Sequence, residues 1–138
     1  FTRNPYDRIV SWFCYYTQLR NDKNTQIKHR NFYGSRYLSG KFIDFVRYGP
    51  PWIWKNSVLF LIDKFGKSHV DFIGRYENFA MDMNYICEKI KIPNIDNEKY
   101  LNKSEHKHYT NYYCDETIKI TTDRMKLDIE YFKYKYGD

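Results

Sequence analysis

The sequence is poor in cysteine and shows no metal-binding pattern. Its three cysteines, Cys14, Cys87 and Cys114, form no C-x-x-C pair and no Cys/His cluster of zinc-site spacing. An odd number of thiols argues against a disulfide framework. Two of them fall inside helix patterns, where a cysteine usually serves as a small buried apolar group. We therefore expect neither a metal site nor a set of disulfides.

Long apolar runs and glycine-rich loops are also missing. The longest apolar run, VLFLI at 58–62, is far too short to cross a bilayer, and no lipidation motif is visible. We expect a cytoplasmic location, in a bacterium or a virus, in preference to the Golgi lumen. No G-x-x-x-x-G-K-[ST] motif or similar basic glycine-rich loop occurs. That absence excludes the usual phosphate-cradling loop from these residues.

What the chain does contain is a moderate positive charge and many aromatic residues. Its 138 residues fit one domain and carry a net charge of +6, from 23 basic and 17 acidic residues. The basic residues are spread along the chain, which suits an anionic ligand better than a dedicated nucleic-acid surface. Aromatic residues make up 20% of the chain, including 15 tyrosines. Part of that excess reflects a general bias of the sequence towards Tyr, Lys, Asn and Ile, so the presence of any single tyrosine is weak evidence for a binding role.

Hydrophobic spacing predicts four helices, two strands and two polar loops. The expected helices are about 5–19, 41–49, 78–92 and 115–133; the strands 57–63 and 69–77, after a strand end at 1–2; the loops 20–40 and 93–113. The last helix should bury one of its faces, which carries Ile118, Thr122, Met125, Ile129 and Phe132. This order is typical of an α/β fold. With so few strands, we expect residues 1–138 to be a single partial domain, the C-terminal half of an α/β domain.

The start of the first helix is a candidate anion site. Pro5 suits a first helical turn, Asn4 is a plausible N-cap, and Asp7 places negative charge near the opening. The N-terminus of a helix offers unpaired N–H groups and a partial positive charge. Arg3, directly before this helix, can bind a phosphate through two parallel hydrogen bonds.

Two further side chains bear on this site. Ser11 lies two turns along the helix and can add a hydroxyl donor, and Arg8 is a second basic candidate. The alternative is that Arg3 pairs with a carboxylate and Ser11 merely fills a helix position. The residues alone leave both interpretations open.

Three ordered blocks resemble a known family. TRNPYDRIVSWF (2–13) resembles the 3′-phosphate-binding segment of sulfotransferases that use 3′-phosphoadenosine 5′-phosphosulfate (PAPS). FIGRYENFAMDMNYICEKIKI (72–92) is similar to the strand-into-helix segment of that family. The segment from LNKSEHK to EYFKYKYG (101–137) resembles the C-terminal loop and final helix of carbohydrate and bacterial sulfotransferases. The resemblance implies the C-terminal portion of a P-loop-NTPase-like sulfotransferase fold, with part of a parallel sheet plus helices.

The resemblance also implies roles for individual residues. Arg3 and Ser11 would bind the 3′-phosphate of the nucleotide, and Tyr76 would lie against its adenine. Lys103 and Ser104 would belong to a loop that folds over the nucleotide. For Tyr76 the alternative is core packing, and for Lys103 and Ser104 it is an ordinary solvated loop. Glu77 is expected to be structural, near the start of its helix or paired with Arg75.

The implied activity is transfer of a sulfuryl group from PAPS, without a metal, to a hydroxyl of a carbohydrate-type acceptor. The expected partners are the nucleotide donor, a glycan or other hydroxyl acceptor, and a separate N-terminal half, with no specific nucleic acid. The family's 5′-phosphosulfate loop and usual catalytic base have no counterpart in this sequence. We therefore assign no catalytic residue and expect the 138-residue chain alone to be inactive. The alternative is a non-catalytic module that binds a nucleotide or single-stranded nucleic acid.

Overall fold

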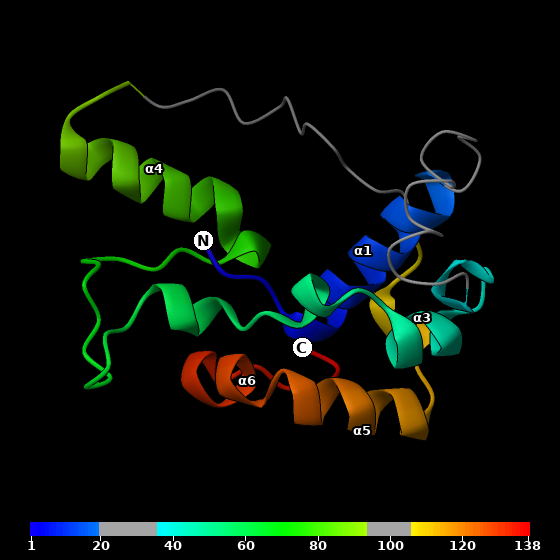
Figure 1. Cartoon of the computed structure of the whole chain (residues 1–138). Coiled ribbons are helices and arrows are strands. Elements are labelled where there is room, and N and C mark those ends of the chain that lie inside the picture. Colours follow the sequence, from blue (N-terminus) through cyan, green and yellow to red (C-terminus); the bar gives the residue numbers. More distant parts are fainter. Residues whose placement is uncertain (20–35, 94–105) are drawn as a thin grey trace.

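The computed structural model describes residues 1–19, 36–93 and 106–138. Five α-helices span these ranges: α1 (Pro5–Leu19), α3 (Phe42–Tyr48), α4 (Phe79–Ile90), α5 (Asp115–Arg124) and α6 (Lys126–Phe132). Short 3-10 turns join them, at Arg36–Leu38, Pro51–Trp54, Ser57–Phe60, Tyr76–Asn78 and Tyr109–Tyr112. Figure 1 shows α1, α3 and α5 grouped together, with α6 continuing from α5, whereas α4 projects to the other side of the molecule.

Helix α1 begins and ends where its sequence pattern predicts. The Asn4 side chain caps it, because Asn4 Oδ1 accepts a hydrogen bond from the Tyr6 N–H at 3.0 Å. Pro5 has no N–H to satisfy, and Asp7 supplies the expected negative charge in the first turn. The N-terminal N–H groups of α1 are therefore partly used by the chain itself.

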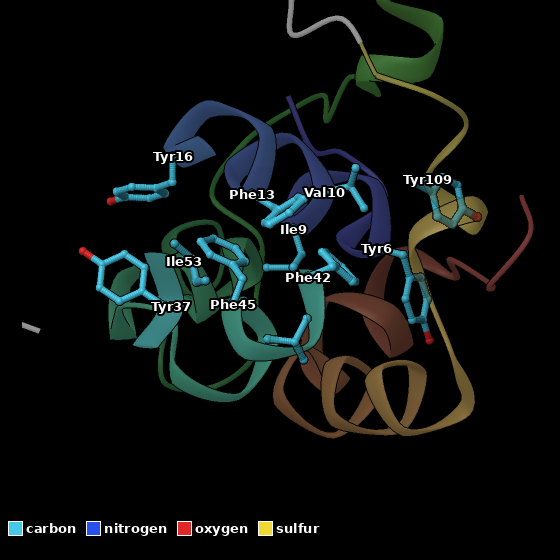
Figure 2. Close-up of a cluster of buried hydrophobic side chains, with 11 residues drawn as sticks. Tyr6, Ile9, Val10, Phe13, Tyr16, Tyr37, Phe42, Phe45, Ile53 and Tyr109 are labelled. Atoms are coloured by element: carbon cyan, nitrogen blue, oxygen red, sulfur yellow. The ribbon is translucent and has the colours of Figure 1, made fainter. Parts of the chain in front are cut away.

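Aromatic side chains fill the main core (Figure 2). Helix α1 buries one face that meets α3. The Phe13 ring centroid lies 5.3 Å from that of Phe42 and 5.6 Å from that of Phe45, both with edge-on geometry. The other buried members are Tyr6, Ile9, Val10, Tyr16, Tyr37, Val46, Ile53 and Tyr109. This packing fixes the direction of α1, and thereby the position of its first turn.

The predicted α/β fold is wrong for the described residues. They contain helices and two isolated β-bridges, Thr2 with Arg75 (parallel) and Ile62 with Ser68 (antiparallel), and no strand or sheet. The P-loop-NTPase-like parallel sheet expected from the resemblance is therefore not part of the structure that these residues form. The strands predicted at 57–63 and 69–77 are absent as well.

Local hydrogen bonds explain why the first of these segments does not form a strand. The Ser57 and Val58 N–H groups both donate to the carboxylate of Asp128, at 2.8 and 2.9 Å. The Leu61 N–H bonds the Val58 carbonyl at 2.9 Å, as in a 3-10 turn. Because these donors are already satisfied, the segment has little left to offer a neighbouring strand. The strand was predicted because β-branched and aromatic residues are common in strands, but here that composition does not determine the structure.

The last predicted helix is divided at Met125. The Asp128 N–H would normally donate to the Arg124 carbonyl, but it donates to Asn56 Oδ1 at 3.0 Å. The Arg124 carbonyl accepts instead from Asn56 Nδ2, also at 3.0 Å. The amide of Asn56 thus takes the place of one helical hydrogen bond, which separates α5 from α6.

The face predicted to be buried on this helix pair is confirmed. Met125 and Phe132 are buried, and Ile118 and Ile129 pack partly buried against the main core. Thr117, Thr121 and Asp128 are buried as well. The four-three spacing survives the break because α6 continues close to the direction of α5 (Figure 1).

Candidate functional site

Arg3 is held between the first turn of α1 and the segment before α4. Its Nε donates to Asp7 Oδ2 at 2.6 Å, and its guanidinium carbon lies 4.5 Å from the centroid of the Tyr76 ring. The side chains of Arg3 and Asp7 are each 21% exposed, so both are reachable from solvent. The sequence analysis gave pairing with a carboxylate as one interpretation of Arg3, and the contact with Asp7 confirms that pairing. Tyr76 is the second residue that Arg3 contacts.

The Thr2–Arg75 bridge brings these residues together. The Thr2 N–H donates to the Gly74 carbonyl, and the Tyr76 N–H donates to the Thr2 carbonyl, both at 2.8 Å. Two steps further along, the Asn4 N–H donates to Glu77 Oε1 at 2.6 Å. The segments at the start of α1 and before α4 are therefore fixed side by side.

Glu77 is structural, as the sequence predicts. Besides the hydrogen bond from the Asn4 N–H, its carboxylate accepts one from the Tyr134 hydroxyl at 3.2 Å. Burial, reinforced by the charge of Glu77, raises the pKa of Tyr134, so this phenol keeps its proton and remains a donor. Arg75 is engaged elsewhere: it donates to the Phe132 carbonyl at 2.6 Å and lies over the Tyr134 ring.

The two residues that Arg3 contacts, Asp7 and Tyr76, line an open hollow of about 600 Å³. It is lined by Asp7, Tyr76, Glu77, Asn78, Phe79, Ala80 and Met81. Tyr76 is 42% exposed, so the alternative that this tyrosine packs in the core is wrong. Tyr76 has one face towards Arg3 and belongs to the wall of the hollow.

The remaining predicted site residues are less closely gathered. Ser11 follows Asp7 by one turn of α1 and is half-buried, so it lies along the same side of the helix as Asp7. Lys103 and Ser104 lie outside the described residues. Arg3 and Tyr76 are therefore the two predicted residues that the structure shows in contact.

Arg8, the second basic candidate, has a structural role. Its Nη1 donates to Ser57 Oγ at 2.6 Å and to Asp128 Oδ2 at 3.3 Å, and its Nη2 donates to the Lys55 carbonyl at 2.8 Å. Burial lowers the pKa of Arg8, and the neighbouring Asp128 carboxylate opposes that shift. With its terminal nitrogens bonded, Arg8 has little capacity left for an anion. The sequence analysis missed the pairing of Arg8 with Asp128. The feature that could have indicated it is a charged residue, Asp128, on an otherwise apolar helix face.

A second hollow, of about 490 Å³, lies between the end of α3 and the end of α5. Its two arginines are already engaged. Arg47 makes two hydrogen bonds of 2.8 Å to the Glu116 carboxylate, and Arg124 donates to the Val46 carbonyl at 2.8 Å while covering the Trp54 ring. These two arginines therefore have less capacity left for an anionic ligand than Arg3 has.

Other kinds of site are not seen in the described ranges. Within residues 1–19, 36–93 and 106–138, no group of three or more His, Cys, Asp or Glu side chains is arranged to hold a metal ion. No helix in the same ranges is long and apolar enough to cross a membrane. The three cysteines are free, with Cys87 buried and Cys114 exposed.

Comparison with known proteins defines the family. The model of the sulfotransferase family matches residues 1–135. The chain belongs to the sulfotransferase family, and the resemblance seen in its three sequence blocks is confirmed. It is also similar to an uncharacterized protein of Archaeoglobus fulgidus, with 33% identity over 93 residues. That match covers 67% of this chain and 66% of the relative, and no solved structure matches.

Proposed function

We propose that this chain binds the 3′-phosphate end of PAPS for a sulfotransferase that acts on a hydroxyl of a carbohydrate-type acceptor. Membership of the sulfotransferase family supports sulfuryl transfer as the general chemistry. The proposal goes further than that chemistry in naming PAPS as the donor and a carbohydrate-type hydroxyl as the acceptor. These two assignments rest on the position of Arg3 and on the likeness of the C-terminal block to carbohydrate sulfotransferases.

The position of Arg3 carries the proposal. Its Nε is bonded to Asp7, and among the described residues its terminal Nη1 and Nη2 have no hydrogen-bond partner. Two adjacent N–H donors on a rigid plane match two oxygens of a phosphate. Ser11, one turn beyond Asp7, is the proposed second ligand. The residues present therefore fit a phosphate at the edge of the hollow.

The hollow suits the neutral part of the nucleotide. Its two carboxylates, Asp7 and Glu77, disfavour a second anion there, and that of Glu77 can accept a hydrogen bond from an amino group such as that of adenine. Tyr76 is partly exposed beside Arg3 and lines the hollow. We therefore place the base against Tyr76 and the 3′-phosphate against Arg3, with Lys103 and Ser104 proposed to cover the nucleotide.

PAPS supplies the activated sulfuryl group, which passes to the acceptor hydroxyl. The residues of this chain contribute affinity and orientation: Arg3 and Ser11 fix the phosphate, and Tyr76 fixes the plane of the base. We assign none of them to stabilising charge at sulfur. We propose that residues 1–138 form the nucleotide-binding part of a sulfotransferase domain, with the 5′-phosphosulfate loop and the catalytic base supplied by a separate part.

Calorimetric titration of the purified chain tests the proposal. We expect adenosine 3′,5′-bisphosphate to bind more tightly than adenosine 5′-monophosphate, because only the former carries the 3′-phosphate. A single-stranded oligonucleotide, titrated at several salt concentrations, serves as the comparison ligand. Equal affinity for the two nucleotides, or tighter and strongly salt-dependent binding of the oligonucleotide, would reject the proposal in favour of a nucleic-acid-binding module.

A further inference from the structure

We infer that Asp7 is a positioning residue of the proposed nucleotide site, which orients the Arg3 guanidinium so that its two terminal nitrogens face the 3′-phosphate. The inference rests on the proposed function, because Asp7 has this role only if Arg3 binds that phosphate. Asp7 itself would make no contact with the phosphate.

The contacts of Arg3 leave its phosphate-binding edge available. A guanidinium has three nitrogens, and the Nε of Arg3 is the one that donates to Asp7 Oδ2, at 2.6 Å. Nη1 and Nη2 form the outer edge, which is the pair that matches two phosphate oxygens. Had Asp7 bonded those outer nitrogens, it would compete directly with the ligand.

Two contacts from different elements fix the guanidinium plane. Asp7 holds one edge, and Tyr76 lies against one face at 4.5 Å from its ring centroid. Arginine is a long side chain with many rotamers, and ordering it normally opposes binding. Because Arg3 is already held in the free protein, less ordering remains when the phosphate arrives.

Asp7 can act this way because it is itself held in place. It belongs to the first turn of α1, which Asn4 caps and the core packs from the other side. The neighbouring Arg8 is bonded to Asp128, 3.3 Å away. The ion pair that Asp7 forms is with Arg3, four residues earlier in the chain.

Charge alone predicts the opposite effect of removing Asp7. A carboxylate near a phosphate repels it, so Asp7→Ala should strengthen the binding of an anionic nucleotide if Asp7 had no other role. Loss of the positioning contact should weaken binding. The sign of the change therefore separates the two effects.

The experiment is a set of calorimetric titrations of the whole chain with adenosine 3′,5′-bisphosphate and with adenosine 5′-monophosphate. The variants are Asp7→Ala, Asp7→Asn, Asp7→Glu, Arg3→Ala, the double variant Arg3→Ala with Asp7→Ala, and Glu130→Ala. Glu130 is the matched control, because it pairs with Lys126 at the same four-residue spacing, at 3.6 Å, on an exposed part of α6. Its loss changes the net charge by the same amount. The thermal unfolding of each variant is recorded to confirm that it is folded.

We expect Asp7→Ala to weaken binding of the bisphosphate about tenfold, equivalent to about 1.4 kcal/mol, and to leave the monophosphate unaffected. Asp7→Asn should also weaken it, and Asp7→Glu should restore most of the loss, since a longer carboxylate can still reach Nε. In the Arg3→Ala background, Asp7→Ala should have no further effect. Glu130→Ala should bind like the wild-type chain.

Failure of the inference and failure of the proposed function give different results. If Arg3→Ala weakens bisphosphate binding but Asp7→Ala and Asp7→Asn bind as tightly as the wild-type chain or more tightly, Asp7 is not a positioning residue. An additive loss in the double variant would lead to the same conclusion. If the wild-type chain does not prefer the bisphosphate to the monophosphate, the proposed function fails and the role of Asp7 fails with it.

Discussion

Asn56 is a single side chain that determines where one helix ends and the next begins. Its amide both donates to the Arg124 carbonyl and accepts from the Asp128 N–H, each at 3.0 Å. An asparagine amide has a donor and an acceptor side by side, so it can replace a backbone hydrogen bond on both sides. Close to this break, the Asp128 carboxylate accepts hydrogen bonds from the Ser57 and Val58 N–H groups.

Asn56→Ala should lower the free energy of unfolding by about 1–3 kcal/mol, because the buried Asp128 N–H loses its partner. Urea denaturation followed by circular dichroism measures the change. Asn111→Ala is the control, since the amide of this exposed asparagine donates to the nearby His108 carbonyl, at 3.0 Å. Equal stability of Asn56→Ala and Asn111→Ala would show that α5 and α6 join without cost when the amide is absent.

A second prediction at the residue scale concerns the contribution of Asp128 to stability. Asp128→Asn removes the charge opposite Arg8 and leaves one oxygen where two accepted hydrogen bonds, so we expect a loss of about 3 kcal/mol in unfolding free energy. The side chain of Asp128 is fully buried, at 0% exposure, whereas that of Glu130 is 61% exposed in its pair with Lys126. Glu130→Gln should therefore change stability by less than about 1 kcal/mol. A loss no larger than that of Glu130→Gln would contradict a structural role for the Arg8–Asp128 pair.

At the scale of elements, helices with a strong apolar period were predictable and the strands were not. The bounds of α1 follow from Asn4, Pro5 and a regular apolar face, all of which act locally. The state of residues 57–63 depends on Asp128, about seventy positions away, and no local pattern reveals that contact. Strand composition alone therefore predicted the wrong element.

The candidate site also has a part that local sequence could predict and a part that depends on contacts between distant residues. Arg3 and Ser11 were found through a motif within one helix start, and their spacing along the chain fixes their relation to Asp7. The contact of Tyr76 with Arg3 depends on the bridge between Thr2 and Arg75, which brings together parts of the chain far apart in sequence. Sequence reasoning could propose both residues for one ligand but could not show that they touch.

Gly49 gives a test of the turn that ends α3. A Cβ at this position would lie 2.5 Å from the Phe45 carbonyl oxygen and 2.7 Å from Ile53 Cδ1. Because one of these is a backbone atom of Phe45, which is buried, Gly49→Ala should cost about 1–3 kcal/mol of unfolding free energy.

Gly74→Ala is the matched control for that measurement. A Cβ at Gly74 would meet ring atoms of Phe1, the nearest at 2.5 Å, but Phe1 is 52% exposed and its ring can move aside. We expect a loss of less than about 0.5 kcal/mol. A larger loss for Gly74→Ala than for Gly49→Ala in thermal or urea unfolding would contradict this account of the α3 end.

On the scale of the whole molecule, the described residues form a helical body whose bonds run between distant parts of the chain. Near the candidate site, Glu77 connects the start of α1 to the C-terminal region, through the Asn4 N–H and the Tyr134 hydroxyl. Nucleotide affinity should therefore depend on the folded state of the entire chain. Binding of the bisphosphate should in turn raise the unfolding temperature.

The chain alone should not catalyse sulfuryl transfer. It carries no basic glycine-rich loop for the 5′-phosphosulfate, and the proposed residues bind the opposite end of the nucleotide. Transfer of radiolabelled sulfate from PAPS to a panel of glycans measures this. PAPS-dependent product above that of a heat-denatured sample would contradict the prediction and would show that other residues of this chain stabilise charge at sulfur.

The central claim, that Arg3 binds the 3′-phosphate, is tested most directly by the affinity of the Arg3→Ala variant for adenosine 3′,5′-bisphosphate, measured by calorimetry. We predict a loss of about 1.5–3 kcal/mol for Arg3→Ala and about 0.5–1.5 kcal/mol for Ser11→Ala. Arg36→Ala is the control, because Arg36 also lies over a tyrosine ring, that of Tyr48, at 5.4 Å. Its affinity should equal that of the wild-type chain. Unchanged affinity in a folded Arg3→Ala variant, or an equal loss in Arg36→Ala, would contradict the claim.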